Sequence, residues 1–463
     1  MPTDRRRFSG PSARAGSLIA EKLCRYMRLP TLSIERDPAG SSCTSAEQRL
    51  PRWWIPMLTL AVVVTGMAYT LLWPRLIRHA SWYWLEPGDI WSSIRSAHWI
   101  GWGGFSFIYS AHSYLVTLPG FHVFLTPVVI LSSKFGLTEA VPGLVQIPKP
   151  TAWLLVGPLT LACSGVAVYG LERLARTLGV SVQRRQVLAI LAAAALWPTL
   201  VMWGHPEDVL ALGLTALALE QALSDHWTAS AWLMGGALCM QLYTIGVIPI
   251  FVGLAGLRRA APWLARAAVL PGALLLAVLI PNPHATLHAL LNQPNYPRED
   301  YPTPWVLLAP KLGADVVASG PSRVIGLLVA CGLGVLAARF RRNPLAIICL
   351  LGAALAVRCL FETVMDAYYG APAVAVVLVV VAGSHWLRLA LASIASAGLT
   401  VQTYIHSGMW AYWGEMTAIL VALFLVATYR RSSLASARFF VSRHRRASPA
   451  TPEPYAARIH AAG

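Results

Sequence analysis

The stretch WWIPMLTLAVVVTGMAYTLLW, residues 53–73, contains no charged residue. A helix needs about 20 apolar residues to cross the ~30 Å hydrocarbon core of a bilayer, so this stretch can span a membrane once. The remainder of the 463-residue chain has the same character, since 56% of all residues are hydrophobic, 12% are charged and the mean hydropathy is +0.56. Such a composition excludes a soluble globular enzyme and a disordered chain.

The distribution of apolar stretches predicts an all-α polytopic membrane protein with about ten full transmembrane helices. The stretches are continuous in Leu, Ala and Val and lack the alternation of an outer-membrane β-barrel strand, so helices are the expected spanning elements. We expect full crossings near residues 54–73, 151–171, 187–203, 208–223, 267–281, 323–338, 345–357, 370–384, 389–405 and 414–429.

Two further apolar segments, 115–133 and 229–257, are expected to enter the membrane only partway. Positively charged loops face the cytoplasm, and full crossings at both segments would put arginine clusters outside. Pro119 and Pro127 interrupt the first segment, and the second is expected to break between residues 243 and 246. We therefore expect two re-entrant or half-inserted hairpins, with both termini of this plasma-membrane protein in the cytoplasm.

This topology divides the chain into a membrane domain, residues 53–430, and two basic cytoplasmic tails, 1–52 and 431–463, which we expect to be disordered. Two long extracytoplasmic loops, 75–114 and 282–321, carry most of the acidic residues and histidines together with the short outer turns. Any chemistry is therefore expected on the outer face.

Charge, motifs and cysteines exclude several other functions. The formal net charge of +17 is attributed to the inner membrane surface, so we expect no nucleic-acid partner. The sequence has no Walker loop, which argues against an ATP-driven pump, and we expect no nucleotide or redox cofactor. The seven cysteines include no CxxC pair and predict neither a zinc site nor a disulfide framework.

Glu86 and Asp89 lie in the first outer loop, within the sequence LEPGDIWSS that begins at Leu85. Trp84 and Trp91 flank them, which places the acids at the membrane surface, where a partly desolvated carboxylate can act as a base. The sequence also allows a simpler interpretation, in which Asp89 caps the helix that follows and the tryptophans form an interfacial belt.

The motif Gly204-His205-Pro206-Glu207-Asp208 is expected to open an apolar helix on the outer side. Proline at the first helical position and acids in the first turn favour a helix start, each acid by ~0.3–1 kcal/mol. The three side-chain types could equally hold a divalent cation or a sugar hydroxyl. His205, Glu207 and Asp208 are therefore candidate substrate-binding residues.

A third polar group runs from Arg358 through Glu362 to Tyr368 and Tyr369. Arg358 and Glu362 are four residues apart and can form a local ion pair on one helix face. An arginine at the outer end of a crossing also invites an anionic partner, and a lipid-linked phosphate is the obvious candidate. Arg323, near the start of another crossing, is a similar candidate.

Five short motifs on or near the expected outer face carry a family resemblance. They are Pro87-Gly88-Asp89, Gly101-Trp102-Gly103-Gly104-Phe105, Tyr114-Leu115-Val116-Thr117-Leu118-Pro119-Gly120-Phe121, Gly204-His205-Pro206-Glu207-Asp208 and Tyr368-Tyr369-Gly370-Ala371-Pro372. Over about residues 53–430 the chain resembles the polytopic GT-C glycosyltransferases, especially the bacterial mannosyltransferase-like proteins that use polyprenyl-phosphate sugars. It departs from them in the spacing of Glu86 and Asp89 and in Gln241, where relatives often carry Lys.

The resemblance implies transfer of a sugar from a polyprenyl-phosphate donor to an extracytoplasmic glycan or glycolipid acceptor, with inversion. By the same resemblance Asp89 would be the general base, and Arg358 or another outer cation would hold the donor phosphate. The implied partners are the lipid-linked donor, membrane lipids and the acceptor. Two alternatives fit the composition: a transporter or lipid flippase, which would place ionisable residues near the midplane, and a catalytically inactive membrane scaffold.

Overall fold

The computed structural model describes residues 50–78, 87, 89–109, 117–137, 151–298, 300–366, 368–384, 386–402 and 410–428. Residues 44–429 form one compact unit, and the described part of it is almost entirely helical. Glu86 and nearly all of the two expected tails lie outside the described residues.

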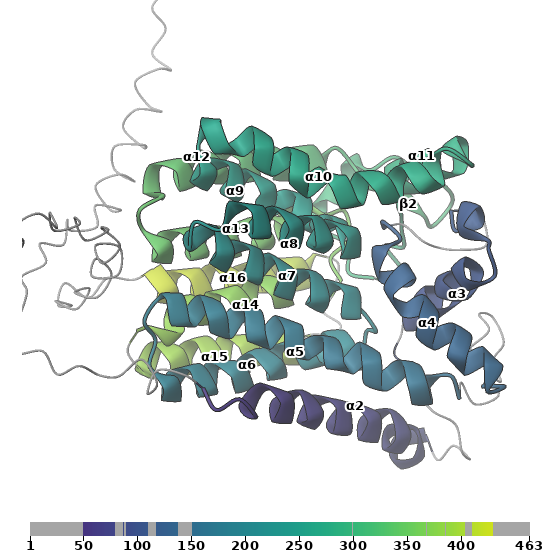
Figure 1. Cartoon of the computed structure of the whole chain (residues 1–463), viewed down its shortest axis with the longest axis horizontal. Coiled ribbons are helices and arrows are strands. Elements are labelled where there is room, and N and C mark those ends of the chain that lie inside the picture. The colour runs from purple at the N-terminus through teal and green to yellow at the C-terminus, as the bar shows by residue number, and fades with distance from the viewer. Residues whose placement is uncertain are drawn as a thin grey trace, which may run out of the picture. The chain divides into compact units, whose positions relative to one another are not determined.

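Twelve of the described helices lie side by side in a bundle (Figure 1). They are α2 (Trp54–Arg78), α5 (Trp153–Thr177), α6 (Val182–Val201), α7 (Pro206–Leu223), α8 (Trp227–Met240), α9 (Ile248–Ala255), α10 (Leu257–Leu279), α12 (Ser322–Phe340), α13 (Pro344–Phe361), α14 (Ala371–Ala382), α15 (Trp386–Gln402) and α16 (Ala411–Thr428). Each expected crossing overlaps one of these helices, which confirms an all-α architecture.

Among the described residues, five helices are long and apolar enough to span a membrane: α2, α5, α12, α13 and α16. The α10 helix would be a sixth, although it bends by 40° near its middle. The prediction of ten full crossings is therefore corrected to five or six. The shortfall has physical causes, because α14 is only 12 residues long, about 18 Å at 1.5 Å per residue, and α7 carries three acidic residues.

The two segments expected to enter the membrane partway form short helices. Residues 115–133 contain α4 (Gly120–Lys134), a 15-residue helix that packs against α3 (Ile90–Gly101) at one end of the bundle (Figure 1). In residues 229–257 the chain leaves α8 at Gln241 and continues through a 3-10 helix, η2 (Leu242–Val247), into α9. The expected break at 243–246 falls inside η2.

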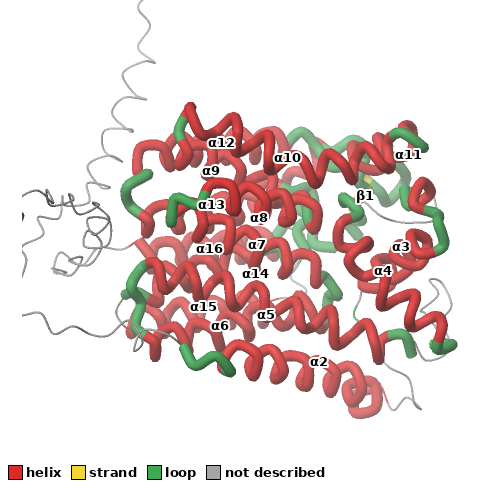
Figure 2. Tube along the Cα trace, viewed as in Figure 1, coloured by secondary structure: helices red, strands yellow, loops and turns green. Residues whose placement is uncertain are grey.

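The described parts of the two segments expected to be long outer loops contain regular structure. The first contains the end of α2, then α3 and the 3-10 helix η1 (Phe105–Phe107). The second contains α11 (Pro283–Leu291), η3 (Pro304–Leu308) and the antiparallel strands β1 (Pro294–Asn295) and β2 (Val317–Ala318). In Figure 2 the two strands lie near the end of the bundle that carries α3, α4 and α11.

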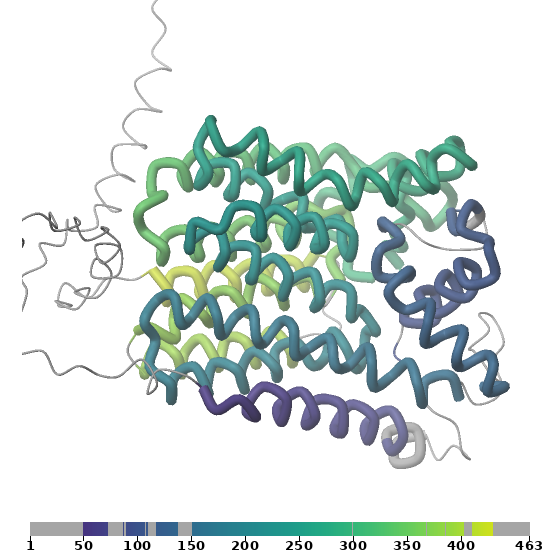
Figure 3. Tube along the Cα trace, viewed as in Figure 1, coloured from purple at the N-terminus to yellow at the C-terminus, as the bar shows by residue number. Residues whose placement is uncertain are grey.

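Segments far apart in sequence meet at this end of the bundle. Figure 3 shows α3 and α4, early in the chain, beside the later α10–α11 segment. Ile108, Tyr109 and Val278 form a small buried cluster there, against which Ile100 and Ala285 pack.

Helices α5, α6 and α7 are held together by close helix packing and a buried ion pair. A Cβ on Gly213 of α7 would lie 2.7 Å from the backbone nitrogen of Ala167 on α5, so glycine allows the two helices to approach. A buried ion pair joins Glu172 of α5 to Arg185 of α6. These contacts fix the relative position of α5, α6 and α7, and the first turn of α7 carries the candidate site.

Candidate functional site

Two chain segments meet where α3 and α7 begin. Gly204 has φ +73°, a conformation that favours glycine, and a Cβ there would lie 2.8 Å from the Ile90 nitrogen and 3.1 Å from Cβ of Pro87. The backbone N–H of Asp89 donates to the carbonyl oxygen of Trp203 over 3.0 Å. Glycine at position 204 therefore lets the turn before α3 sit directly on the turn before α7.

This contact brings Asp89 to His205 and Glu207. The imidazole Nε2 lies 2.9 Å from Oδ2 of Asp89, and Nδ1 lies 2.8 Å from Oε1 of Glu207. Asp89 occupies the N-cap position of α3, but its side chain makes no capping hydrogen bond. The interpretation of Asp89 as a helix cap is thus wrong, because its carboxylate reaches across to His205.

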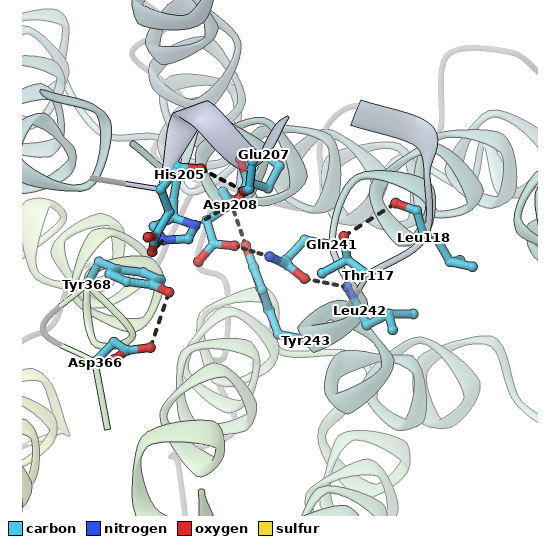
Figure 4. A network of polar contacts seen from close by, with 12 residues as sticks. Thr117, Leu118, His205, Glu207, Asp208, Gln241, Leu242, Tyr243, Asp366 and Tyr368 are labelled. Atoms are coloured by element: carbon cyan, nitrogen blue, oxygen red, sulfur yellow. Dashed lines mark hydrogen bonds and ion pairs between the residues drawn. The ribbon is translucent and has the colours of Figure 1, made fainter. Parts of the chain in front are cut away.

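Asp208 is the most buried acid of the site, with its side chain 1% exposed. Its Oδ1 accepts a hydrogen bond from Nε2 of Gln241 over 2.6 Å, and its Oδ2 lies 3.5 Å from Nη1 of Arg358. The hydroxyl of Tyr243 donates to the backbone carbonyl of Asp208 over 2.8 Å. Asp208 therefore joins α7, η2 and α13, as Figure 4 shows for its contacts with Gln241 and Tyr243.

Tyr368 forms one wall of the site (Figure 4). Its ring stacks on the imidazole of His205 with the centroids 3.9 Å apart, and its hydroxyl donates to Oδ2 of Asp366 over 3.2 Å. The neighbouring ring of Tyr369 lies 3.7 Å from the guanidinium carbon of Arg358, a cation–π distance.

The segment that carries these tyrosines is anchored by residues 300–305, which precede α12. The hydroxyl of Thr303 donates to the carbonyl of Glu362 over 2.6 Å, and the backbone N–H of Met365 donates to the carbonyl of Tyr301 over 2.8 Å. The indole N–H of Trp305 donates to Leu360. The segment 300–305 thus holds the turn after α13 in place.

Glu362 and Arg323 form a separate pair beside the main cluster. The Arg323 Nε donates to Oε2 of Glu362 over 2.8 Å, whereas the ion pair of Arg358 is with Asp208. The structure therefore replaces the local Arg358–Glu362 pair with two long-range ones.

Charge and burial set the protonation of two groups outside the spanning helices. Burial alone would lower the pKa of His205, but the carboxylates of Glu207 and Asp89 outweigh it and raise that pKa well above its ordinary value of 6.5. Burial also raises the pKa of Asp366. At neutral pH His205 is therefore an imidazolium, with an N–H for each of its two carboxylates.

An apolar crevice opens beside Tyr368, between α6, α14, α15 and α16. Its free space is about 30 Å³, close to the volume of one water molecule. Its lining is mostly apolar, with a few hydroxyls: Ala195, Pro198, Thr199, Trp203, Tyr368, Gly370, Ala371, Val374, Ser396, Leu399, Thr400 and Met416. Trp203 and Tyr368 line this apolar space, and Tyr368 also stacks on His205 of the charged cluster.

Most of the sequence-predicted site residues meet in this one place: Asp89, His205, Glu207, Asp208, Arg358, Tyr368 and Tyr369. Within the described ranges no group of three or more His, Cys, Asp or Glu side chains could hold a metal ion. Both ring nitrogens of His205 are engaged by carboxylates, one from Asp89 and one from Glu207.

Four contributors were not predicted: Trp203, Gln241, Tyr243 and Asp366. Gln241 had a signal in the sequence, because it is a single polar amide in an apolar stretch, at the point where α8 ends. Trp203 and Asp366 become recognisable only when the turns after α6 and α13 meet, and Tyr243 only when η2 packs against the start of α7.

Comparison with known proteins does not indicate a function, so the functional argument rests on the geometry of the site. No family model matches the chain, and no curated protein matches it.

Proposed function

We propose that this chain is a membrane glycosyltransferase of the GT-C type, which transfers a sugar from a polyprenyl-phosphate donor to an extracytoplasmic glycan or glycolipid. The observation that carries the proposal is the position of the acid–imidazole–arginine cluster beside an apolar crevice between helices. A lipid-linked sugar has the same division into a charged, hydroxyl-rich head and a hydrocarbon chain.

In this proposal Asp89 is the general base. Its side chain is 60% exposed, so an acceptor hydroxyl can reach it, and Oδ2 is oriented by His205. Asp89 takes the hydroxyl proton while the acceptor oxygen bonds to the anomeric carbon. The bond from that carbon to the phosphate oxygen breaks, and the phosphate leaves with the bonding electrons, which inverts the anomeric centre.

Arg358 is the proposed anchor for the donor phosphate. Its 3.5 Å contact with Asp208 is at the outer limit of a hydrogen bond, so its guanidinium can still donate to a phosphate. Arg323 is the second candidate, since its side chain is 35% exposed beside Glu362. Tyr368 and Tyr369 are buried, and their rings pack against His205 and Arg358, so in this proposal they support those two residues.

We assign the cluster to the extracytoplasmic side of the plasma membrane, with both termini cytoplasmic. Arginines at the other ends of the same helices support this orientation, because positive charge gathers on the cytoplasmic side. They include Arg173 and Arg176 near the end of α5 and Arg184 and Arg185 at the start of α6.

The test is sugar transfer in proteoliposomes that contain the purified chain, radiolabelled mannosyl-phosphoryl polyprenol and octyl mannoside. We expect Asp89→Asn to lower the rate by about 10²–10⁴-fold, the usual contribution of a general base, without changing protein abundance. Asp315→Asn is the matched control, because Asp315 pairs with Arg298 on the surface, outside the cluster. Full activity of Asp89→Asn would remove Asp89 from the mechanism.

A lipid flippase is the second candidate, since an apolar crevice between helices would serve either activity. The buried charges of α6 and α7 argue for the transferase, because Arg185, Glu207, Asp208 and Glu220 all lie in a first or last turn rather than at mid-helix. Movement of the labelled lipid across the bilayer without acceptor, unaffected by Asp89→Asn, would favour the flippase. If the chain shows neither sugar transfer nor lipid movement, it is an inactive scaffold.

A further inference from the structure

His205 is enclosed by charged and aromatic groups. Both ring nitrogens lie within 2.9 Å of a carboxylate, one from Asp89 and one from Glu207, and the ring of Tyr368 covers one face at 3.9 Å. The second oxygen of Glu207 is buried and has no hydrogen-bond partner among the described residues. Glu207 therefore depends on His205 for the compensation of its buried charge.

We propose that His205 is a positioning residue for Asp89 rather than a sugar ligand: its imidazolium bridges Asp89 and Glu207 and so fixes the start of α3 on the start of α7. The inference rests on the proposed function only in the role of Asp89 as the base. It changes the role of two residues first considered as substrate ligands, since the nitrogens of His205 and one oxygen of Glu207 are already engaged.

Protonation of the imidazole is essential to this bridge. A neutral imidazole has one N–H and one lone pair, so it can donate to only one carboxylate and repels the other. The groups that face His205 are mainly acidic: Asp89 from α3, Glu207 and Asp208 from α7, and Asp366 and Tyr368 from the segment after α13. The guanidinium of Arg358 is paired with Asp208 and offsets only part of this negative charge.

The direction of the pH effect follows from the raised pKa of His205. The bridge contributes its full stability below about pH 6.5, the ordinary pKa of the imidazole, and loses it as the pH rises through the higher pKa of the folded state. Above that pH the imidazole can donate to only one of the two carboxylates, and the buried Glu207 competes with the exposed Asp89 for that N–H. We therefore expect sugar transfer to fall on the alkaline side together with the local stability.

The same protonation state decides where the acceptor proton goes. An imidazolium has no free lone pair and cannot accept a proton from Asp89. The exposed side of the Asp89 carboxylate must release it to water instead. His205 thus orients the base without taking part in proton transfer.

The first measurement is the melting temperature of the detergent-solubilised chain between pH 5.5 and 10. We expect the wild type to be more stable than His205→Gln at pH 6 and the difference to shrink as the pH rises. In Glu207→Gln the alkaline loss should move about 1–3 pH units lower, because one of the two charges that raise the pKa is gone. His284→Gln, a change at an exposed histidine of α11, should leave the wild-type profile unaltered.

The second measurement is the pH profile of kcat/KM in the transfer assay. His205→Gln should lose the alkaline limb and lower kcat with little change in the KM for the donor, as expected for a residue that positions the base. A wild-type alkaline limb in His205→Gln, or a large rise in KM with kcat intact, would overturn the positioning role and identify a substrate ligand.

The two measurements separate failure of this inference from failure of the proposed function. The melting profiles need no transferase activity, so a pH-dependent bridge in a chain without sugar transfer would support the inference and refute the function. Sugar transfer together with identical melting profiles of wild type and Glu207→Gln would support the proposed function and refute the inference. Glu207→Gln keeps the test decisive if His205→Gln does not fold.

Discussion

The contact between the turns before α3 and α7 can be tested with one added methyl group, in Gly204→Ala. Alanine at φ +73° costs roughly 1–2 kcal/mol in the left-handed region. Its Cβ would lie 2.8 Å from the Ile90 nitrogen, whereas ordinary contacts begin at 3.4 Å, so the turn that carries Asp89 must retreat by about 0.6 Å. The 2.9 Å hydrogen bond between Asp89 and His205 would lengthen to about 3.5 Å.

Such a displacement affects both activity and stability. A misplacement on the order of 1 Å at a reacting group can cost about 10²-fold in rate, so we expect the transfer rate of Gly204→Ala to fall by about that factor. The free energy of unfolding should fall by about 2–5 kcal/mol, the sum of backbone strain and repacking. Both quantities are measured on the same preparation, by sugar transfer in proteoliposomes and by thermal unfolding in detergent.

Gly103 provides the matched control. It has φ +80°, and a Cβ there would meet nothing within 4 Å, so Gly103→Ala introduces the same type of backbone strain without a steric clash. We expect Gly103→Ala to lose stability but to retain most of its activity. Equal transfer rates in Gly103→Ala and Gly204→Ala would refute the reasoning, because the displacement of Asp89 would then have no consequence.

Three other predictions concern the bundle and the crevice. Glu172→Gln removes the ion-pair partner of buried Arg185 and should lower the free energy of unfolding by about 3–5 kcal/mol, with a loss below 1 kcal/mol arguing against the pair. Gly253→Ala would place a Cβ 2.1 Å from a carbonyl oxygen of α12 and should lower the free energy of unfolding by about 1–3 kcal/mol. At Gly332 a Cβ would meet nothing within 4 Å, so Gly332→Ala should be neutral or slightly stabilising. Thermal unfolding compares the two variants. Ala195→Leu narrows the crevice, so a lipid chain loses the burial of about two methylenes, or about 1.6 kcal/mol of binding free energy. The KM for the polyprenyl donor should therefore rise about tenfold with kcat retained. An unchanged KM would show that the crevice does not bind the donor.

Much of the secondary structure could be predicted from the sequence because its signals are local. The apolar run at 53–73 predicts α2, and Pro206 with two acids behind it predicts the start of α7 at the residue where the structure begins that helix. The number of crossings could not be predicted in the same way. Apolar stretches such as α14 are shorter than a bilayer is thick, and their burial among other helices replaces contact with lipid.

The site residues were recognisable as chemical types, but their partners were not. Local spacing favoured a pair between Arg358 and Glu362 and a capping role for Asp89, since sequence analysis weighs neighbours within one helical turn. The structure instead joins Asp89 to His205 and Arg358 to Asp208, across 116 and 150 residues of chain.

By itself, then, the sequence determined that this protein is a helical membrane protein with acids, a histidine and arginines near helix ends. Only the tertiary structure decided which of these charges meet. Burial makes an unpaired charge costly, so packing selects the long-range partners that local spacing cannot identify.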